Sequence, residues 1–134
     1  MKKVMCTGTF DMIHPGHLYY FSEAKKYGDK LIVVVARDET SKKFKGKKPV
    51  HSEKERLEAI RMLKIVDEAV LGNQDNIFGI IEEIKPDVVC LGYDQNVQKQ
   101  QIEEELMRRS IKAEVVRIDA YMPNLYKSSK LKNK

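Results

Sequence analysis

The sequence contains only two cysteines in 134 residues, Cys6 and Cys90, and both lie inside apolar runs typical of strands. Two such thiols do not make a disulfide framework, so we expect buried thiols in a reducing compartment, the cytoplasm. No apolar run approaches the roughly 20 residues that a membrane helix needs. The N-terminal residues lack the pattern of a secretion signal, and none is expected. These shortages argue against disulfide-rich, membrane-spanning and secreted classes.

The chain also lacks internal repeats and low-complexity segments. Its length fits one domain with one core, which we place at residues 1–134. The net charge of +5 favours anionic partners, namely nucleic acid, an anionic membrane surface or phosphorylated small molecules. Charge alone does not choose among these partners.

Apolar runs alternate with amphipathic runs along the whole chain. Strands are predicted at residues 4–7, 31–36, 69–71, 88–91 and 115–118, and helices around 18–24, 52–63, 77–84 and 102–107. Short connections between alternating strands and helices are typical of a parallel sheet wrapped by helices. The predicted fold class is therefore α/β, a Rossmann-like parallel sheet of about five strands with helices on both faces. Ligands of such sheets bind at the carboxyl edge, where the strand order switches.

Two local signals refine the helices. Ser52 with Glu55 three residues later predicts a capping box at a helix start, and the buried stripe of that helix is predicted to be Leu57, Ile60, Met62 and Leu63. Gly28 is predicted to end the first helix as its C′ residue.

The segment from Thr7 to His17 carries the strongest chemical signal, because it joins the first strand to the first helix. Gly8 permits a sharp turn with exposed backbone N–H groups, and Pro15 suits the first turn of a helix. Gly16 leaves room for a phosphate at the helix N-terminus, which attracts anions. The spacing of His14 and His17 lets both rings donate to one bound phosphate and stabilise charge that develops there.

Other interpretations of the histidines remain open. They could hold a metal from one helical face, although the sequence offers no obvious third ligand. They could also be capping or surface histidines without a catalytic role.

The segments Gly8–Asp11 and His14–His17 together resemble the HxGH nucleotidylyltransferases, and the resemblance covers nearly the whole chain. It implies direct in-line transfer of a nucleoside monophosphate, without a covalent enzyme intermediate, and a divalent metal such as Mg²⁺. By this resemblance Thr9 and Phe10 line the nucleotide, and His14 and His17 hold its phosphates.

A lysine-rich segment, residues 42–48, follows the second predicted strand. It could be a solvated loop, a targeting signal or a nucleic-acid patch, but flexible ammonium groups also suit a triphosphate and a phosphorylated acceptor. In similar cytidylyltransferases a K-x-K pair in this loop binds phosphates, and Lys45 and Lys47 match it best. Arg56 could reach the same pocket from the following helix or could be a surface arginine.

Three aspartates follow predicted strands. Asp94 could accept bonds from a base or ribose, or could be an ordinary turn residue. Asp11 and Asp38 could cap a helix or orient a metal, and the sequence does not decide between these roles.

Near the C-terminus, Ser128 and Ser129 resemble the family's serine-rich motif, which contacts the β- and γ-phosphates. The match is incomplete, because the family's arginine six residues earlier is Met122 here and only three residues follow Leu131. A polar tail without this role is the alternative, and Lys127 or Lys130 could replace the missing charge.

The segments 35–40, 45–49 and 91–95 make the chain similar to the archaeal-type FAD synthases, which transfer AMP from ATP to FMN. This similarity implies that Asp94 and Tyr121 contact the nucleotide, although Tyr121 could simply pack on the last strand. Glycerol-3-phosphate cytidylyltransferase, which uses CTP, is the nearest competitor; the absent arginine favours FAD synthase. Small-molecule substrates are thus expected, with no nucleic acid, no membrane and a homodimer. Two non-catalytic alternatives are a nucleic-acid-binding module and a nucleotide sensor.

Overall fold

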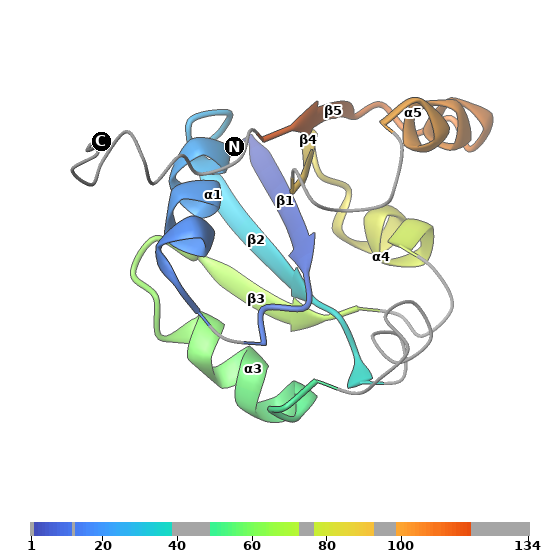
Figure 1. Cartoon of the computed structure of the whole chain (residues 1–134). Coiled ribbons are helices and arrows are strands. Elements are labelled where there is room, and N and C mark those ends of the chain that lie inside the picture. Colours follow the sequence, from blue (N-terminus) through green and yellow to red (C-terminus); the bar gives the residue numbers. More distant parts are fainter. Residues whose placement is uncertain (1, 12, 39–48, 73–76, 93–98, 119–134) are drawn as a thin grey trace, which may run out of the picture.

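A computed structural model describes residues 2–11, 13–38, 49–72, 77–92 and 99–118 (Figure 1). Strands and helices alternate along these residues as predicted, with strand bounds within a residue or two of the expected positions. The elements are β1 Lys3–Gly8, α1 Pro15–Lys25, β2 Lys30–Val35, α3 Glu53–Arg61, β3 Glu68–Leu71, α4 Ile77–Ile84, β4 Val88–Leu91, α5 Lys99–Arg108 and β5 Glu114–Arg117.

The five strands form one parallel sheet in the order β3-β2-β1-β4-β5. This arrangement confirms the predicted fold class. Strands β2 and β3 lie on one side of β1, and β4 and β5 lie on the other, so the direction of strand addition reverses between β1 and β4. In open α/β sheets this reversal marks the place where ligands bind beyond the carboxyl ends of the strands.

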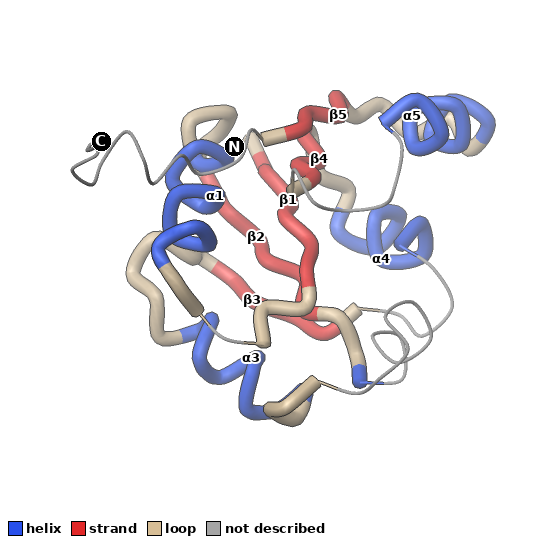
Figure 2. Tube along the Cα trace, in the orientation of Figure 1, coloured by secondary structure: helices blue, strands red, loops and turns tan. Residues whose placement is uncertain are grey.

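The sheet is covered on both faces (Figures 1 and 2), as predicted. Along β1, Val4 and Cys6 join the core cluster beneath α1 and α3, while Met5 joins the cluster beneath α4 and α5. This alternation follows from the two-residue period of side chains in a strand. The strands read as continuous apolar runs because both faces are buried.

The two cysteines confirm the expectation of buried thiols. Both are free and fully buried, and they stand opposite each other in the β1–β4 register. No helix among the described residues has both the length and the apolar character needed to cross a membrane.

Helix α3 begins as predicted, and Leu57, Ile60 and Leu63 lie on its core side as predicted, whereas Met62 does not. The Ser52 hydroxyl accepts a hydrogen bond from the Glu55 N–H at 3.2 Å, and the Glu55 carboxylate accepts one from the Ser52 N–H at 2.9 Å. Met62, predicted to be buried, is 83% exposed. It follows Ile60 by two residues, about 200° around the helix, and so points away from the core. Arg56 is buried instead.

Gly28 has another role than the predicted one. Helix α1 ends earlier, with its C-cap at Lys26. A Cβ at position 28 would lie 2.7 Å from Val4 Cγ2 and 2.8 Å from the Lys2 carbonyl oxygen. Glycine is therefore required by the close approach of this turn to the start of β1.

Candidate active site

The histidine segment lies where β1 ends, beside the point at which the strand order reverses. His14 is the N-cap of α1, with extended backbone (φ −142°, ψ 172°). Its Nδ1 accepts a hydrogen bond from the Gly16 N–H at 3.0 Å. In return, His17 Nδ1 accepts one from the His14 N–H at 3.3 Å. Two backbone N–H groups at the helix start are therefore satisfied by imidazoles.

These bonds set the tautomer of both rings. A nitrogen that accepts a hydrogen bond carries no proton, so in the neutral form of each ring the proton sits on Nε2. The rings stack with centroids 4.0 Å apart and an interplanar angle of 27°. Their Nε2–H groups are thus paired donors at the positive end of a helix dipole, an arrangement that suits a phosphate.

The Phe10 side chain packs against the His17 ring. Its backbone is left-handed (φ 54°), a strained conformation for a non-glycine residue. Its side chain is only 5% exposed and meets the His17 ring edge-on, with centroids 5.4 Å apart. The Phe10 side chain therefore packs against the core, and the expectation that Phe10 lines the nucleotide stays a prediction. The ring lies against Gly8, where an added Cβ would be 2.6 Å from Phe10 Cζ.

Tyr20 ties α1 to both strands that flank the reversal. Its hydroxyl donates to the Cys90 carbonyl at 2.8 Å and approaches the Thr7 carbonyl at 3.4 Å. Burial of this side chain raises the pKa of its hydroxyl well above the ordinary value, so it remains a neutral donor. The end of β1, the end of β4 and the helix that carries His17 are held together by this one group.

Arg56 occupies a different place from the predicted one. It is 1% exposed, and its guanidinium donates to the Thr9 carbonyl at 2.7 Å, the Ala36 carbonyl at 2.7 Å and the His51 carbonyl at 3.0 Å. It also pairs with the Asp38 carboxylate at 2.7 Å. These contacts exclude the surface position that the sequence left open for Arg56, and they occupy its guanidinium with protein acceptors.

The two candidate metal ligands are also engaged. The two Asp11 oxygens accept from the N–H groups of Val50 at 2.8 Å and His51 at 2.9 Å. Desolvation opposes ionisation of Asp11, but these hydrogen bonds outweigh it and lower the pKa of the carboxyl. Asp38 faces Arg56. Within the described ranges, no group of three or more His, Cys, Asp or Glu side chains is arranged to hold a metal ion.

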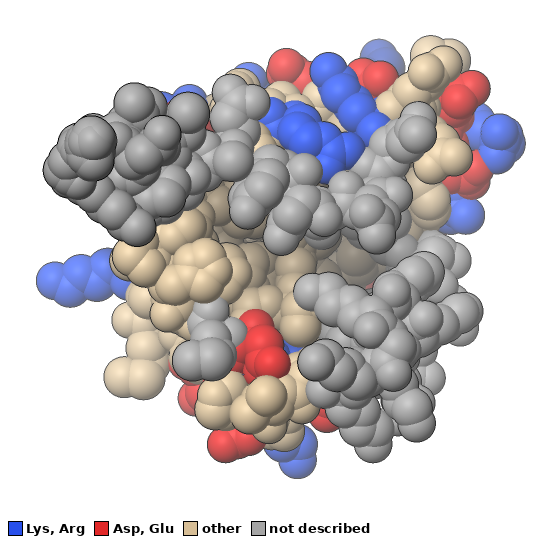
Figure 3. Space-filling view, in the orientation of Figure 1, with Lys and Arg blue, Asp and Glu red and all other residues tan. Residues whose placement is uncertain are grey.

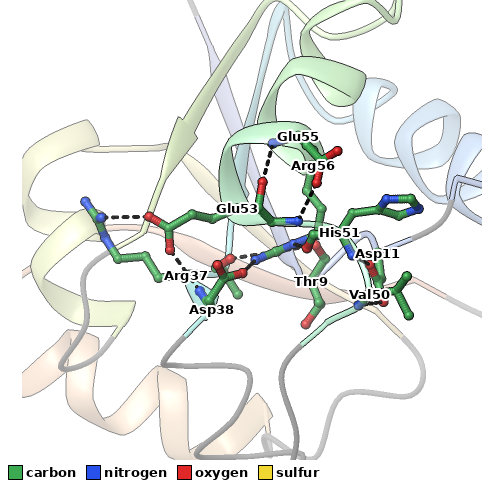
Figure 4. Close-up of polar contacts among 11 residues, drawn as sticks. Thr9, Asp11, Arg37, Asp38, Val50, His51, Glu53, Glu55 and Arg56 are labelled. Atoms are coloured by element: carbon green, nitrogen blue, oxygen red, sulfur yellow. Dashed lines mark hydrogen bonds and ion pairs between the residues drawn. The ribbon is translucent and has the colours of Figure 1, made fainter.

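A third acidic residue, Glu53, extends these contacts to the end of β3 (Figure 4). Glu53, the first residue of α3, accepts from the Asp38 N–H at 2.9 Å and from Arg37 at 3.3 Å. Arg37 Nε in turn donates to the Gly72 carbonyl at 2.7 Å, just beyond β3. The residues that follow β1, β2 and β3 are thereby joined to the start of α3.

Two surface hollows accompany these elements. One, of about 330 Å³, lies between the β1–α1 connection and α3 and includes Phe10, His51 and Ala59 in its lining. The other, of about 490 Å³, lies over β2 and β3 beside α4. Neither is lined by His14 or His17, so we assign the nucleotide to neither. On the face in Figure 3, the described Lys and Arg side chains lie mainly over β4, β5 and α5.

Several predicted site residues lie outside the described residues. They are Lys45, Lys47, Asp94, Tyr121, Ser128 and Ser129, and their roles stay predictions. Of the others, the structure brings Gly8, His14, Pro15, Gly16 and His17 together at one junction. Sequence reasoning missed the enclosed position of Arg56. Its spacing of four residues from Ile60 and seven from Leu63, both on the core side, was the available signal.

Comparison with known proteins places this site in a family. A model described as "Cytidylyltransferase-like" matches residues 5–134. The chain belongs to this family. Membership confirms the predicted resemblance to nucleotidylyltransferases.

The relatives that match this chain cover most of its length. An FAD synthase of Ferroglobus placidus is 55% identical over 121 residues, which are 90% of this chain and 78% of the relative. An FAD synthase of Thermoplasma acidophilum is 43% identical over 134 residues, 100% of this chain and 94% of the relative.

Solved structures agree with the fold. A Thermoplasma volcanium protein described as a lipopolysaccharide core biosynthesis protein superposes with a TM-score of 0.88 at 43% identity, covering 91% of this chain and 99% of that one. A pantoate-beta-alanine ligase from Francisella tularensis superposes with a TM-score of 0.64 at 13% identity, covering 87% and 58%. The latter likeness concerns the fold alone.

Proposed function

We propose that this chain is an FAD synthase, which transfers AMP from ATP to FMN and releases pyrophosphate. The observation that carries the proposal is the pair of mutually capping histidines at the N-terminus of α1, in a chain 55% identical to an FAD synthase over 90% of its length. The pair supplies phosphate-directed donors, and the relatives supply the substrate class.

The chemistry follows from the paired donors. A phosphate oxygen of FMN attacks the α-phosphorus of ATP, and the bond from that phosphorus to the leaving pyrophosphate breaks in line. Negative charge grows on the oxygens around the α-phosphorus and on the leaving group. Donors already fixed in place stabilise this charge without reorganising. The Nε2–H groups of His14 and His17 fulfil this role, and the α1 dipole adds to it.

The remaining assignments rest on the family resemblance. Lys45 and Lys47 bind phosphates, Asp94 and Tyr121 contact the nucleotide, and Ser128 and Ser129 contact the β- and γ-phosphates. Thr9 lines the nucleotide. Because Asp11 and Asp38 already bind backbone N–H groups and Arg56, we assign Mg²⁺ to the nucleotide phosphates, where it neutralises charge. The protein acts in the cytoplasm as a homodimer and does not bind nucleic acid.

A substrate screen tests the proposal. The purified protein is incubated with Mg²⁺ and either ATP plus FMN or CTP plus glycerol 3-phosphate, and products are separated by chromatography while pyrophosphate is measured. FAD is expected from the first mixture, with pyrophosphate in equal amount. Product from the second mixture alone would identify the competing cytidylyltransferase. Nucleotide binding with no product from either would support a sensor, and salt-sensitive RNA or DNA binding alone would support a nucleic-acid module.

A further inference from the structure

Arg56 is the one charged residue in the buried set of the described part of the chain. A buried cation is costly unless hydrogen bonds and an opposite charge compensate it. Here the compensation comes from the Thr9, Ala36 and His51 carbonyls and from the Asp38 carboxylate. Every one of these partners lies in a connection at the carboxyl edge of the sheet, and none lies within a strand.

The partners come from three segments that are far apart in the sequence. Thr9 lies 47 residues before Arg56 and follows β1, Asp38 lies 18 residues before it and follows β2, and His51 lies two residues before the start of α3. A planar guanidinium directs its donors in several fixed directions at once, whereas a lysine ammonium offers a single point charge. Only arginine can span these acceptors together.

Hydrogen bonds of two neighbouring carboxylates, Asp11 and Glu53, join the same three segments. The Asp11 carboxylate, two residues after Thr9, binds the N–H groups of Val50 and His51. The Glu53 carboxylate binds the Asp38 N–H. We call Arg56, Thr9, Asp11, Ala36, Asp38, His51 and Glu53 the Arg56 network. It holds the start of the segment that leads to His14, and it holds both described flanks of residues 39–48.

We propose that Arg56 is a positioning residue for nucleotidyl transfer. It touches no substrate; it fixes the β1–α1 connection relative to the end of β2 and the start of α3. The inference rests on the proposed function, since the transfer step is its readout. A displacement of about 1 Å in a reacting group can cost on the order of 10²-fold in rate, so loosening this network lowers kcat more than it weakens ATP binding.

The test compares Arg56→Lys with Arg61→Lys. Arg61 lies on the same helix, but it is exposed and pairs with Glu58 on the surface. Arg56→Lys is expected to fold, to lower kcat for FAD formation by about 10²-fold and to change the Kd for ATP, measured by calorimetry without FMN, by less than about threefold. Arg61→Lys is expected to match the wild type in both quantities. If Arg56→Lys does not fold, Asp38→Asn, which removes the charged partner, is measured in its place.

Hydrogen exchange followed by mass spectrometry gives a readout that needs no substrate. Exchange is expected to quicken in peptides that contain the amides of Asp38, Val50 and His51, while β1 and β4 stay protected. Equal losses of kcat and ATP affinity would indicate direct substrate contact and overturn the inference. Faster exchange with unchanged kcat would also overturn it, by showing a purely structural role. A wild-type protein that makes no FAD refutes the proposed function, and the exchange result is then read separately.

Discussion

At the scale of single residues, His14 and His17 combine two tasks that separate ring atoms perform. In each ring Nδ1 accepts a backbone N–H and so helps to begin α1. In the same neutral ring Nε2 carries the proton and can donate to a phosphate. Stability and catalysis can therefore be separated by a substitution that keeps one ring atom's function and removes the other.

His14→Asn is such a substitution. Asparagine is among the best N-cap residues, and its side-chain oxygen can take over from Nδ1, but it has no group at the position of Nε2. We expect a melting temperature equal to or above that of the wild type and a loss of about 10²–10³ in kcat. Thermal melts and steady-state FAD formation check both, with Ser22→Ala on the exposed side of α1 as the control. Unchanged kcat would remove His14 from the mechanism.

At the scale of elements, the β1–α1 connection is held by contacts on both sides. Phe10 fills the space between Gly8 and His17, and Tyr20 binds the ends of β1 and β4. A strained backbone such as that of Phe10 persists only when its surroundings over-determine it. The conformation of this connection should therefore change when volume is added at Gly8, against the Phe10 ring.

Gly8→Ala tests this sensitivity. The added methyl would lie 2.6 Å from Phe10 Cζ, so the ring must move and the His17 ring that rests on it moves too. We expect a loss of about 1–3 kcal/mol in the free energy of unfolding together with a clear fall in kcat.

Gly28→Ala is the matched control for this prediction. It meets the Lys2 carbonyl at 2.8 Å, at the opposite edge of the sheet. It should reduce stability while leaving kcat of the folded enzyme near the wild-type value. Equal effects of the two variants on kcat would show that displacing the Phe10 ring does not disturb catalysis through His17. Denaturant titrations and kinetics measured well below both melting points make the comparison.

At the scale of the whole molecule, carboxylates that accept backbone N–H groups join distant segments. The Asp67 carboxylate binds the Leu31 N–H at 2.7 Å, and this bond, together with Lys25, lowers its pKa. The Asp11 carboxylate does the same for Val50 and His51, again with a lowered pKa. Each carboxylate must stay ionised to keep these bonds at full strength.

Stability should consequently fall in acid. A carboxyl whose pKa is lower in the folded state stabilises the fold above its unfolded value, about 3.9 for aspartate, and loses that contribution as the pH falls towards the folded value. We expect the melting temperature to be nearly constant from pH 7 to 5 and to drop below about pH 4. In Asp67→Asn the drop should be smaller and the melting temperature at pH 7 lower. A variant with the wild-type pH profile would contradict this assignment.

Much of the architecture followed from local patterns. The capping pair Ser52 and Glu55 marked the start of α3 correctly, and the apolar run over 31–36 marked β2, because capping and burial on both faces leave signals within a few residues. Met62 was misplaced, although its position two residues after Ile60, about 200° around the helix, already places it on the face away from the core.

The features of the candidate site likewise separate into those that the local sequence predicts and those that depend on the tertiary structure. The sequence alone determined that a glycine turn, a proline and two histidines spaced for one phosphate meet at a strand-to-helix junction, since these residues act within one turn of chain. Only the tertiary structure decided which groups Arg56 binds, that Phe10 packs against His17 and that Asp11 binds Val50. The contacts of Asp11 with Val50 and of Arg56 with Thr9 join residues 39 and 47 positions apart, which folding brings together and no local periodicity encodes.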